Sequence, residues 1–159
     1  MDALQTAKDI LNHSNVGTMA TVYKGKPHSR YMTFFHDELT LYTATSKDTD
    51  KVDELKNNPY THILIGYDGD GVGDTYLEIL GETTVSDDES MKEKVWNEKL
   101  EGWFDGPDDP KLVILKVTPQ SMRVMNKKGA TTARSSVIKV DVTSKRASFL
   151  WNFQKVTDL

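Results

Sequence analysis

The sequence predicts an α+β protein in which two or three helices flank an antiparallel barrel or sheet of six to seven strands. Three observations support this prediction. Segments rich in β-branched residues are short and are separated by tight turns. Helical apolar spacing is confined to a few short segments. Because strands follow strands instead of alternating with helices, hairpins are favoured over parallel βαβ units.

The first half of the chain begins with a helix and continues as a strand meander. Residues 2–12 place apolar side chains at helical spacing, and Asp2 is a suitable N-cap. Turn residues then separate the expected strands, at residues 16–23, 28–35 and 39–43. A short helix follows, with Val52 and Leu55 facing inward. Pro59 ends this helix, because the residue before a proline disfavours the helical conformation.

The second half of the chain combines four more strands with one helix. The strands are expected at residues 61–67, 75–85, 111–118 and 120–126. Pro119 separates the last two, because proline cannot donate a ladder hydrogen bond. Ser86 and Glu89 form an S-x-x-E capping box ahead of a helix that reaches about Leu100.

The composition narrows the classes of function. A chain of 159 residues suits one domain. It contains no cysteine, which excludes disulfides, thiolate metal sites and cysteine nucleophiles and is compatible with a reducing cytoplasm. A net charge of −4 argues against nucleic-acid binding. Because there is neither a signal-peptide pattern nor an apolar run near the ~18–20 residues of a membrane span, we expect a cytoplasmic protein without a membrane partner.

Several catalytic and metal-binding patterns are absent from the sequence. The four histidines are scattered and form no H-x-x-H or H-x-x-x-H pair, so no metal site is expected. Residues 68–74 are interpreted as a flexible hairpin loop, because the twelfth position from Asp68 is Ile79 and not the glutamate of a calcium loop. No P-loop exists, and Ser135-Ser136 lacks the context of a nucleophile elbow. Hydrolase and NTPase activities therefore have no support.

Residues 43–51 are the strongest candidate for a binding site. They leave a strand and enter a helix, whose first turn offers free N–H groups and a positive dipole end. Hydroxyl groups can donate to phosphate oxygens, and lysines add full charges. From spacing alone, two interpretations stay open: an ordinary helix cap with solvated lysines, which is the commoner use of such residues, or a phosphate site. The candidate residues are Thr43, Thr45, Ser46, Lys47 and Lys51.

Together with two further motifs, this segment is similar to a known family. The three motifs are H-S-R-Y-M-T at residues 28–33, L-Y-T-A-T-S-K at residues 41–47 followed by Lys51-Val52 and Asn58-Pro59, and Trp96-Asn97 followed by W-F-x-G-x-D-D-P at residues 103–110. They resemble, in order, the strand that edges the flavin ring, the segment that takes the FMN phosphate, and an aromatic-acidic signature. These features mark the general stress protein 26 group of the pyridoxamine 5'-phosphate oxidase-like flavoproteins. The resemblance covers about residues 5–126.

The resemblance implies a fold, a cofactor and an assembly. The expected fold is a split β-barrel at residues 1–126 that binds FMN, followed by an extension at residues 127–159 that matches nothing in the family. The expected assembly is a homodimer with the cofactor near the interface. The cofactor-binding residues implied are Arg30, Tyr31, Met32 and Thr33 at the flavin edge, Thr43, Thr45, Ser46, Lys47 and Lys51 at the phosphate, and Tyr76, Glu78 and Trp103 from the second chain.

The implied activity is that of an FMN-dependent oxidoreductase or a flavin reductase. The chain lacks the C-terminal R-x-H motif with which the true oxidases bind pyridoxal phosphate, so oxidation of pyridoxamine phosphate is not expected. Two alternatives stay open: an FMN-binding stress protein without turnover, and the same barrel holding haem or a deazaflavin. For residues 127–159, the partly helical spacing of Phe149, Leu150, Phe153 and Val156 leaves an added helix, a dimer arm or a disordered tail.

Overall fold

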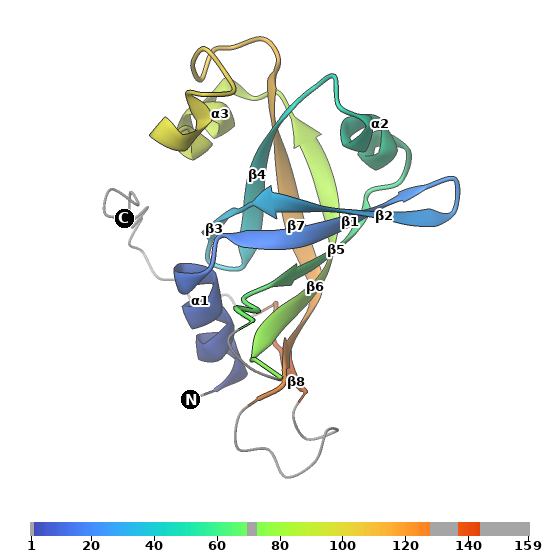
Figure 1. Cartoon of the computed structure of the whole chain (residues 1–159), viewed down its shortest axis with the longest axis vertical. Helices are drawn as coiled ribbons and strands as arrows, with labels where there is room; N and C mark the ends of the chain where they lie inside the picture. The colour runs from blue at the N-terminus through green and yellow to red at the C-terminus, as the bar shows by residue number, and fades with distance from the viewer. Residues whose placement is uncertain (1, 70–72, 128–136, 144–159) are drawn as a thin grey trace.

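The computed structural model describes residues 2–69, 73–127 and 137–143 and confirms the α+β class (Figure 1). Its helices are α1 (Ala3–His13), α2 (Asp50–Asn57), α3 (Glu89–Val95) and the 3-10 helix η1 (Glu98–Leu100). Its strands are β1 (Val16–Tyr23), β2 (Lys26–Thr33), β3 (Phe35–Asp37), β4 (Thr40–Ser46), β5 (Tyr60–Ile65), β6 (Tyr76–Ser86), β7 (Leu112–Met125) and β8 (Ile138–Val140). Within these residues, no helix combines the length and the apolar character needed to cross a membrane.

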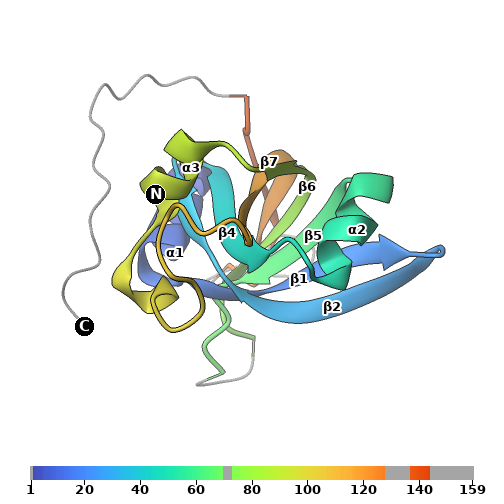
Figure 2. The same ribbon diagram turned by 90° about the horizontal axis from the view of Figure 1, so that it is seen from above.

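The strands form one antiparallel sheet that curls into a split barrel. The order is β2-β1-β5-β6-β7-β4-β3, and β8 pairs with β7 outside this path. The view from above shows the sheet wrapping around the interior, with α2 beside β1, β5 and β6 (Figure 2). The Thr43 hydroxyl donates to the Thr33 carbonyl at 2.8 Å, which links β4 to the end of β2 across the split. The predicted split β-barrel is therefore confirmed.

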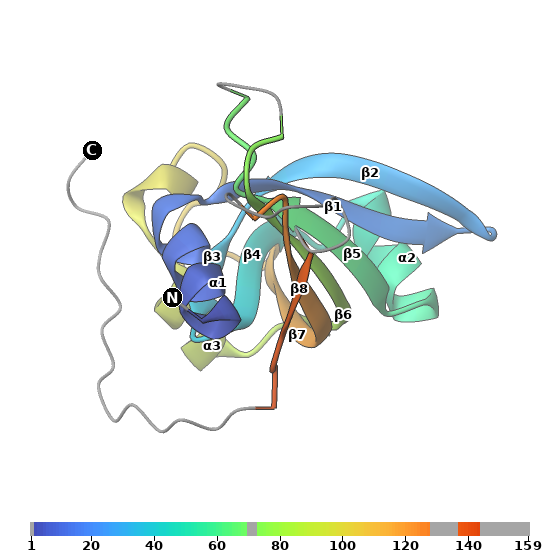
Figure 3. The same cartoon turned by 90° about the horizontal axis from the view of Figure 1, so that it is seen from below.

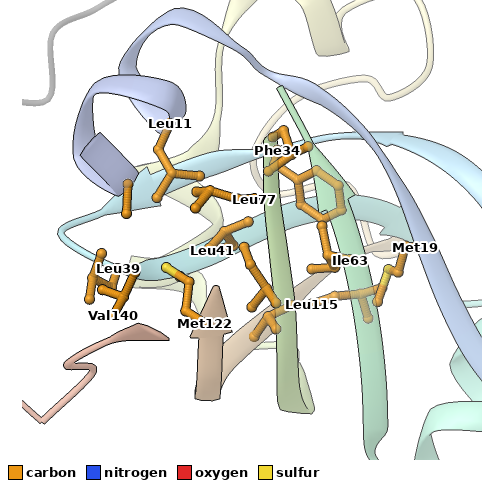
Figure 4. Close-up of a cluster of buried hydrophobic side chains, with 14 of the residues drawn as sticks. Leu11, Met19, Phe34, Leu39, Leu41, Ile63, Leu77, Leu115, Met122 and Val140 are labelled. Atoms are coloured by element: carbon orange, nitrogen blue, oxygen red, sulfur yellow. The ribbon is translucent and has the colours of Figure 1, made fainter. Parts of the chain in front are cut away.

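Alternating apolar residues on the strands fill the interior of the barrel. Met19, Leu41, Ile63 and Leu115 are fully buried and come from four different strands (Figure 4). Each such side chain contributes roughly 1.5–3 kcal/mol by leaving water. Helix α1 closes one end of this core through its buried residues, Ala7 and Leu11. Asp2 caps α1 as expected, because its carboxylate accepts from the Gln5 N–H at 2.8 Å.

Two predicted boundaries were wrong for local reasons. The cap of α3 is Asp88, whose carboxylate accepts from the Met91 N–H at 3.0 Å, while Ser86 still belongs to β6. A helix to Leu100 was also wrong, because α3 ends at Val95 and Asn97 starts the separate helix η1. Aspartate serves as an N-cap as well as serine does, and Asp88 directly precedes the first residue of α3.

The strands around Phe34 and Pro119 also differ from the prediction. The expected strand at residues 28–35 is interrupted, because β2 ends at Thr33 and β3 begins at Phe35. Strand β3 then continues through His36 and Asp37, which were expected to turn. In contrast, Pro119 does not divide β7, because a β-bulge accommodates it opposite Gly81. A Cβ atom on Gly81 would lie only 2.7 Å from the Thr118 carbonyl oxygen, so the close approach of the two strands requires glycine.

Part of the predicted extension belongs to the sheet. Strand β8 pairs with β7 and buries Val140 in the main core. Figure 3 shows α1 and β8 on the side of the barrel away from α2. The helical spacing expected at residues 149–156 and the centre of the predicted 68–74 loop, residues 70–72, lie outside the described residues.

Candidate functional site

The junction between β4 and α2 has the form expected of an anion site. The Ser46 carbonyl accepts from the Thr49 N–H at 3.2 Å and from the Thr49 hydroxyl at 2.9 Å. Thr49 is the N-cap of α2, and its hydroxyl makes no cap hydrogen bond because it is donated to Ser46. The first N–H groups of α2 therefore lack the usual side-chain acceptor, although the Val52 N–H donates to the Thr49 carbonyl at 3.0 Å.

Lys51 returns from the first turn of α2 to the end of β4. Its ammonium group donates to the Thr45 hydroxyl at 2.9 Å, so two residues of the predicted phosphate segment are in contact. Burial and the charge of Arg30 lower the pKa of Lys51 below its usual value, although Asp50 and Glu54 oppose the shift. Burial and a neighbouring cation disfavour the charged form of a lysine, and an anion that binds beside the lysine stabilises that form.

Arg30 is the second cation, and the pairing of β1 with β2 positions it. Thr21 lies opposite His28, and Met19 lies opposite Arg30, so all four side chains are on one face of the hairpin. The Arg30 guanidinium donates to the Thr21 hydroxyl at 2.7 Å and to the Met19 carbonyl at 3.3 Å. This face is directed toward α2, which carries Lys51.

Glu54 is a buried carboxylate that pairs with Arg30 and lies close to Lys51. The sequence did not indicate it as a site residue. Its side chain is only 4% exposed and accepts from Thr21 at 2.5 Å, from His28 Nδ1 at 3.0 Å and from Arg30 at 3.2 Å. Burial raises the pKa of Glu54, but these three hydrogen bonds and the charge of Arg30 outweigh it and hold the pKa below its usual range. We call Glu54, Arg30, Thr21 and His28 the Glu54 cluster. The available signal was its spacing, three residues after Lys51 and next to inward-facing Leu55.

A second carboxylate cluster lies on the open face of the sheet. Glu78 on β6 accepts from His62 Nε2 on β5 at 2.9 Å and from the guanidinium of Arg123 on β7. Burial raises the pKa of Glu78, whereas the hydrogen bonds and charges of His62 and Arg123 outweigh it and lower the pKa. We call these three residues the Glu78 cluster. Within one chain, no hydrogen bond or ion pair among the described residues joins the Glu78 cluster to Arg30 or Lys51.

The remaining phosphate-segment candidates have other contacts. The hydroxyl hydrogen of Thr43 is donated to Thr33, so this threonine joins two strands at the split. The Ser46 hydroxyl accepts from the Asp48 N–H at 3.4 Å in the turn after β4. Lys47 is exposed, its N–H donates to the Lys111 carbonyl, and its charge reaches Asp87.

Of the residues predicted at the flavin ring, Thr33 contacts this segment through Thr43, and Arg30 is close enough to act on the charge of Lys51. Tyr31, Tyr76 and Trp103 have other surroundings. Tyr31 is 78% exposed and points to the opposite face of β2 from Arg30 and Met32. Tyr76 packs edge-on against Tyr67, with ring centroids 5.7 Å apart. Trp103 is 83% exposed in the loop after η1.

The loop at residues 103–110 has one aromatic side chain packed inward and one exposed. Phe104 packs against a second, smaller hydrophobic cluster that includes Tyr42, Val95 and Leu112, whereas Trp103 is exposed. The Asp109 carboxylate accepts from the Asp105 N–H at 3.0 Å and the Lys111 N–H at 2.9 Å, and these backbone hydrogen bonds lower the pKa of Asp109. The loop is therefore internally braced and presents an exposed indole ring.

The open face of β1, β5 and β6 exposes several large apolar side chains. Val16, Tyr60, Leu64 and Leu80 are all exposed, and the strand register places them on the same face as Glu78. Clusters of exposed apolar side chains of this kind mark interaction surfaces.

Comparison with known proteins identifies relatives of the whole barrel. The family model described as pyridoxamine 5'-phosphate oxidase matches residues 3–126. General stress protein 26 of Bacillus subtilis (strain 168) is 56% identical over 125 residues, which cover 79% of this chain and 89% of that protein. The crystal structure of general stress protein 26 from Bacillus anthracis str. Sterne is 29% identical, with a TM-score of 0.74, covering 88% of this chain and all of that one.

More distant solved structures share the fold alone. A heme binding protein from Mycobacterium smegmatis is 15% identical with a TM-score of 0.72, covering 90% of this chain and 59% of that one. A FAD-binding protein from Mesorhizobium loti is 17% identical with a TM-score of 0.63, covering 77% of this chain and 92% of that one. The same barrel thus occurs in proteins described as binding different pigments.

Proposed function

Because the chain belongs to the pyridoxamine 5'-phosphate oxidase family, we propose that it binds FMN and acts as an FMN-dependent oxidoreductase or flavin reductase. The proposal places it in the cytoplasm as a homodimer. Bound FMN would supply hydride and electron transfer, and the chain would hold and orient it. The family and the flavin-binding neighbour support a flavin in general, and the choice of FMN depends on the phosphate site.

The observation that carries the proposal is the presence of two cations, Arg30 and Lys51, near the start of α2. The phosphate of FMN carries nearly two negative charges at neutral pH and accepts several hydrogen bonds. The ammonium group of Lys51, the guanidinium of Arg30 and the N–H groups of α2 supply cations and donors of the required kind. Thr45 lies at the same place through its contact with Lys51. Ser46 and exposed Lys47 are proposed at the rim of this site.

The proposed position of the flavin ring follows from the phosphate site. The main chain of residues 30–33 in β2 would bind the pyrimidine edge of the ring. Strand β2 is an edge strand that pairs with β1 on one side, so its other side offers unpaired backbone donors and acceptors. Thr43 holds this strand end in place through its hydrogen bond to Thr33.

The proposed homodimer uses the open face that carries the Glu78 cluster. Exposed Leu64 and Leu80 lie beside Glu78 on this face. Tyr76 and Glu78 from this face and the outward Trp103 would then approach the cofactor of the second chain. Molar mass measured by light scattering tests this: we expect a dimer, and Leu80→Glu should produce monomers. A wild-type monomer would contradict the arrangement.

A second function is favoured by one observation. The curated relative at 56% identity is named for a stress response and not for a reaction. An FMN-binding stress protein without turnover would satisfy the same site. Oxidation of NADH or NADPH by the FMN-loaded protein separates the two, since rates no higher than those of free FMN favour the non-catalytic function. The visible spectrum separates both from a barrel that holds haem or a deazaflavin.

Titration with two flavins tests the phosphate site. Lys51→Ala should weaken FMN binding by roughly 1.5–3 kcal/mol, the range for a hydrogen bond to a charged group, and should leave riboflavin binding unchanged. Lys56→Ala is the matched control, because Lys56 is exposed in the last turn of the same helix. Equal losses for FMN and riboflavin would remove Lys51 from the site. No uptake of FMN by the wild-type chain would overturn the proposed function.

A further inference from the structure

Glu54 introduces a buried negative charge into a site that is proposed to bind an anion. Its carboxylate is 4% exposed and lies close enough to Lys51 to oppose the lowering of the pKa of that lysine. Charge alone predicts that Glu54 opposes phosphate binding, because like charges repel across a poorly hydrated interior. Its contacts indicate a different role.

The contacts of Glu54 hold Arg30 in one orientation. One guanidinium nitrogen of Arg30 donates to the Thr21 hydroxyl and the Met19 carbonyl, and the other donates to the Glu54 carboxylate. Thr21 in turn donates to the same Glu54 oxygen, so the hydroxyl bridges the two charged groups. Arginine has many rotamers when it is free, and planar contacts of this kind restrict it strongly.

His28 completes the support of the carboxylate. Its Nδ1 atom lies 3.0 Å from the second oxygen of Glu54, and its ring stacks on Tyr23 with centroids 5.5 Å apart. Both carboxylate oxygens are therefore engaged by groups of the β1–β2 hairpin. Glu54 thereby ties α2, which carries Lys51, to the strand that carries Arg30.

We infer that Glu54 is the positioning residue of the anion site, and that it fixes the Arg30 guanidinium beside Lys51 so that both cations meet one phosphate group. This inference rests on the proposed FMN site. It also requires that the gain from a fixed arginine exceeds the repulsion between Glu54 and the phosphate. A guanidinium has five N–H donors, and the contacts of Arg30 with its supports engage only some of them.

The substitution Glu54→Gln separates orientation from charge. Gln removes the negative charge and keeps the size of the side chain, so a purely electrostatic role predicts tighter FMN binding. The positioning role predicts that the Kd for FMN rises about ten-fold, the equivalent of one charge-assisted hydrogen bond, while the Kd for riboflavin stays within about two-fold. Asp53→Asn is the matched control, since it removes the same charge from the exposed side of the same helix and should leave both Kd values unchanged.

A double-mutant cycle tests whether Glu54 acts through Arg30. In an Arg30→Gln background, Glu54→Gln should weaken FMN binding no further, because the arginine to be positioned is absent. Additive losses, tighter FMN binding by Glu54→Gln, or equal losses for FMN and riboflavin would each overturn the inference. The last of these is the result of a merely structural role.

A second variant covers a failure of Glu54→Gln to fold. Thr21→Val removes the bridging hydroxyl and keeps the shape of the side chain, so it should also weaken FMN binding selectively. Unchanged FMN binding in this variant would overturn the inference. If Lys51→Ala does not weaken FMN binding selectively, the proposed function is contradicted. If Lys51→Ala does so but the substitutions at Glu54 and Thr21 have no effect on FMN binding, only the positioning role is contradicted.

Discussion

The Glu54 and Glu78 clusters contain the same three charged residue types but lie in different environments. In each, a glutamate accepts from one histidine nitrogen and from the guanidinium of one arginine. The Glu54 side chain is 4% exposed, and the Glu78 side chain is 21% exposed. The first cluster joins a helix to a hairpin, whereas the second joins three neighbouring strands.

The difference shows that burial and neighbouring groups, more than residue type, determine how much an ion pair contributes to stability and to a binding site. Within a single chain, water competes for the Glu78 cluster on the open face, so its pairs contribute little to the stability of that chain. At Glu54 the carboxylate is shielded and has a third donor in Thr21, and removing one partner leaves a charge with few alternatives. The Glu54 cluster lies beside Lys51 at the start of α2, and this position allows it to assist the proposed anion site.

Removing the arginine of each cluster should give the largest contrast. Arg30→Met should lower the free energy of unfolding by about 2 to 3 kcal/mol, because Glu54 loses a charged hydrogen-bond partner in a buried place. Arg123→Met, the matched change at Glu78, should cost at most about 1 kcal/mol. Urea denaturation of the flavin-free proteins measures both values. Similar losses would mean that the clusters are equivalent despite their burial.

Acid should affect the Glu54 cluster more than the Glu78 cluster. Both glutamates have a pKa below the usual value in the folded chain, so each binds protons more weakly when folded than when unfolded. The stability they add is complete above the unfolded pKa of about 4.3 and is lost as pH falls through the lower folded pKa. Glu54→Gln should therefore reduce the loss of stability as the pH falls below about 4.3 more than Glu78→Gln does.

This acid effect should be smaller than that of Arg30→Met, and urea denaturation at a series of pH values measures it. Three donors act on Glu54 and two act on Glu78, which is the reason for the expected order. A steeper contribution from Glu78 would show that exposure does not decide the acid response.

Local patterns in the sequence predicted the antiparallel α+β fold and placed Lys51 and Thr45 in one candidate segment. Both residues lie in one strand–turn–helix segment and are six residues apart, so their contact is determined by local structure. The Glu54 cluster depends instead on contacts such as Thr21 to Glu54, which are 33 residues apart. Apolar spacing identifies the inner face of a short helix but gives no reason for a carboxylate on it. Only the packing of α2 on the hairpin reveals its partners.

The Glu78 cluster could not be predicted because it depends on a bulge. The register of β6 and β7 shifts at Gly81, where Gln120 is the extra residue of β7. Without the shift, Gln120 would pair with Leu80, and Glu78 would face Met122 instead of Arg123. A shift of one residue exchanges the two faces of a strand, and here it brings Met122 into the core and Arg123 to the open face. The proline at position 119 marked the irregularity but not its consequence for pairing.

The smallest predicted effect concerns salt, and it separates the clusters most directly. A double-mutant cycle measures the coupling between glutamate and arginine in each cluster, free of other contributions of the two side chains. For Glu78 and Arg123 we expect about 0.5 kcal/mol at low salt and a value near zero in 1 M salt, where the screening length is about 3 Å. For Glu54 and Arg30 most of the coupling should persist, because few ions can enter between buried groups. If both couplings vanished together, the Glu54 carboxylate would be accessible to solvent ions, and an arginine held in this way could not stay fixed while a phosphate approached.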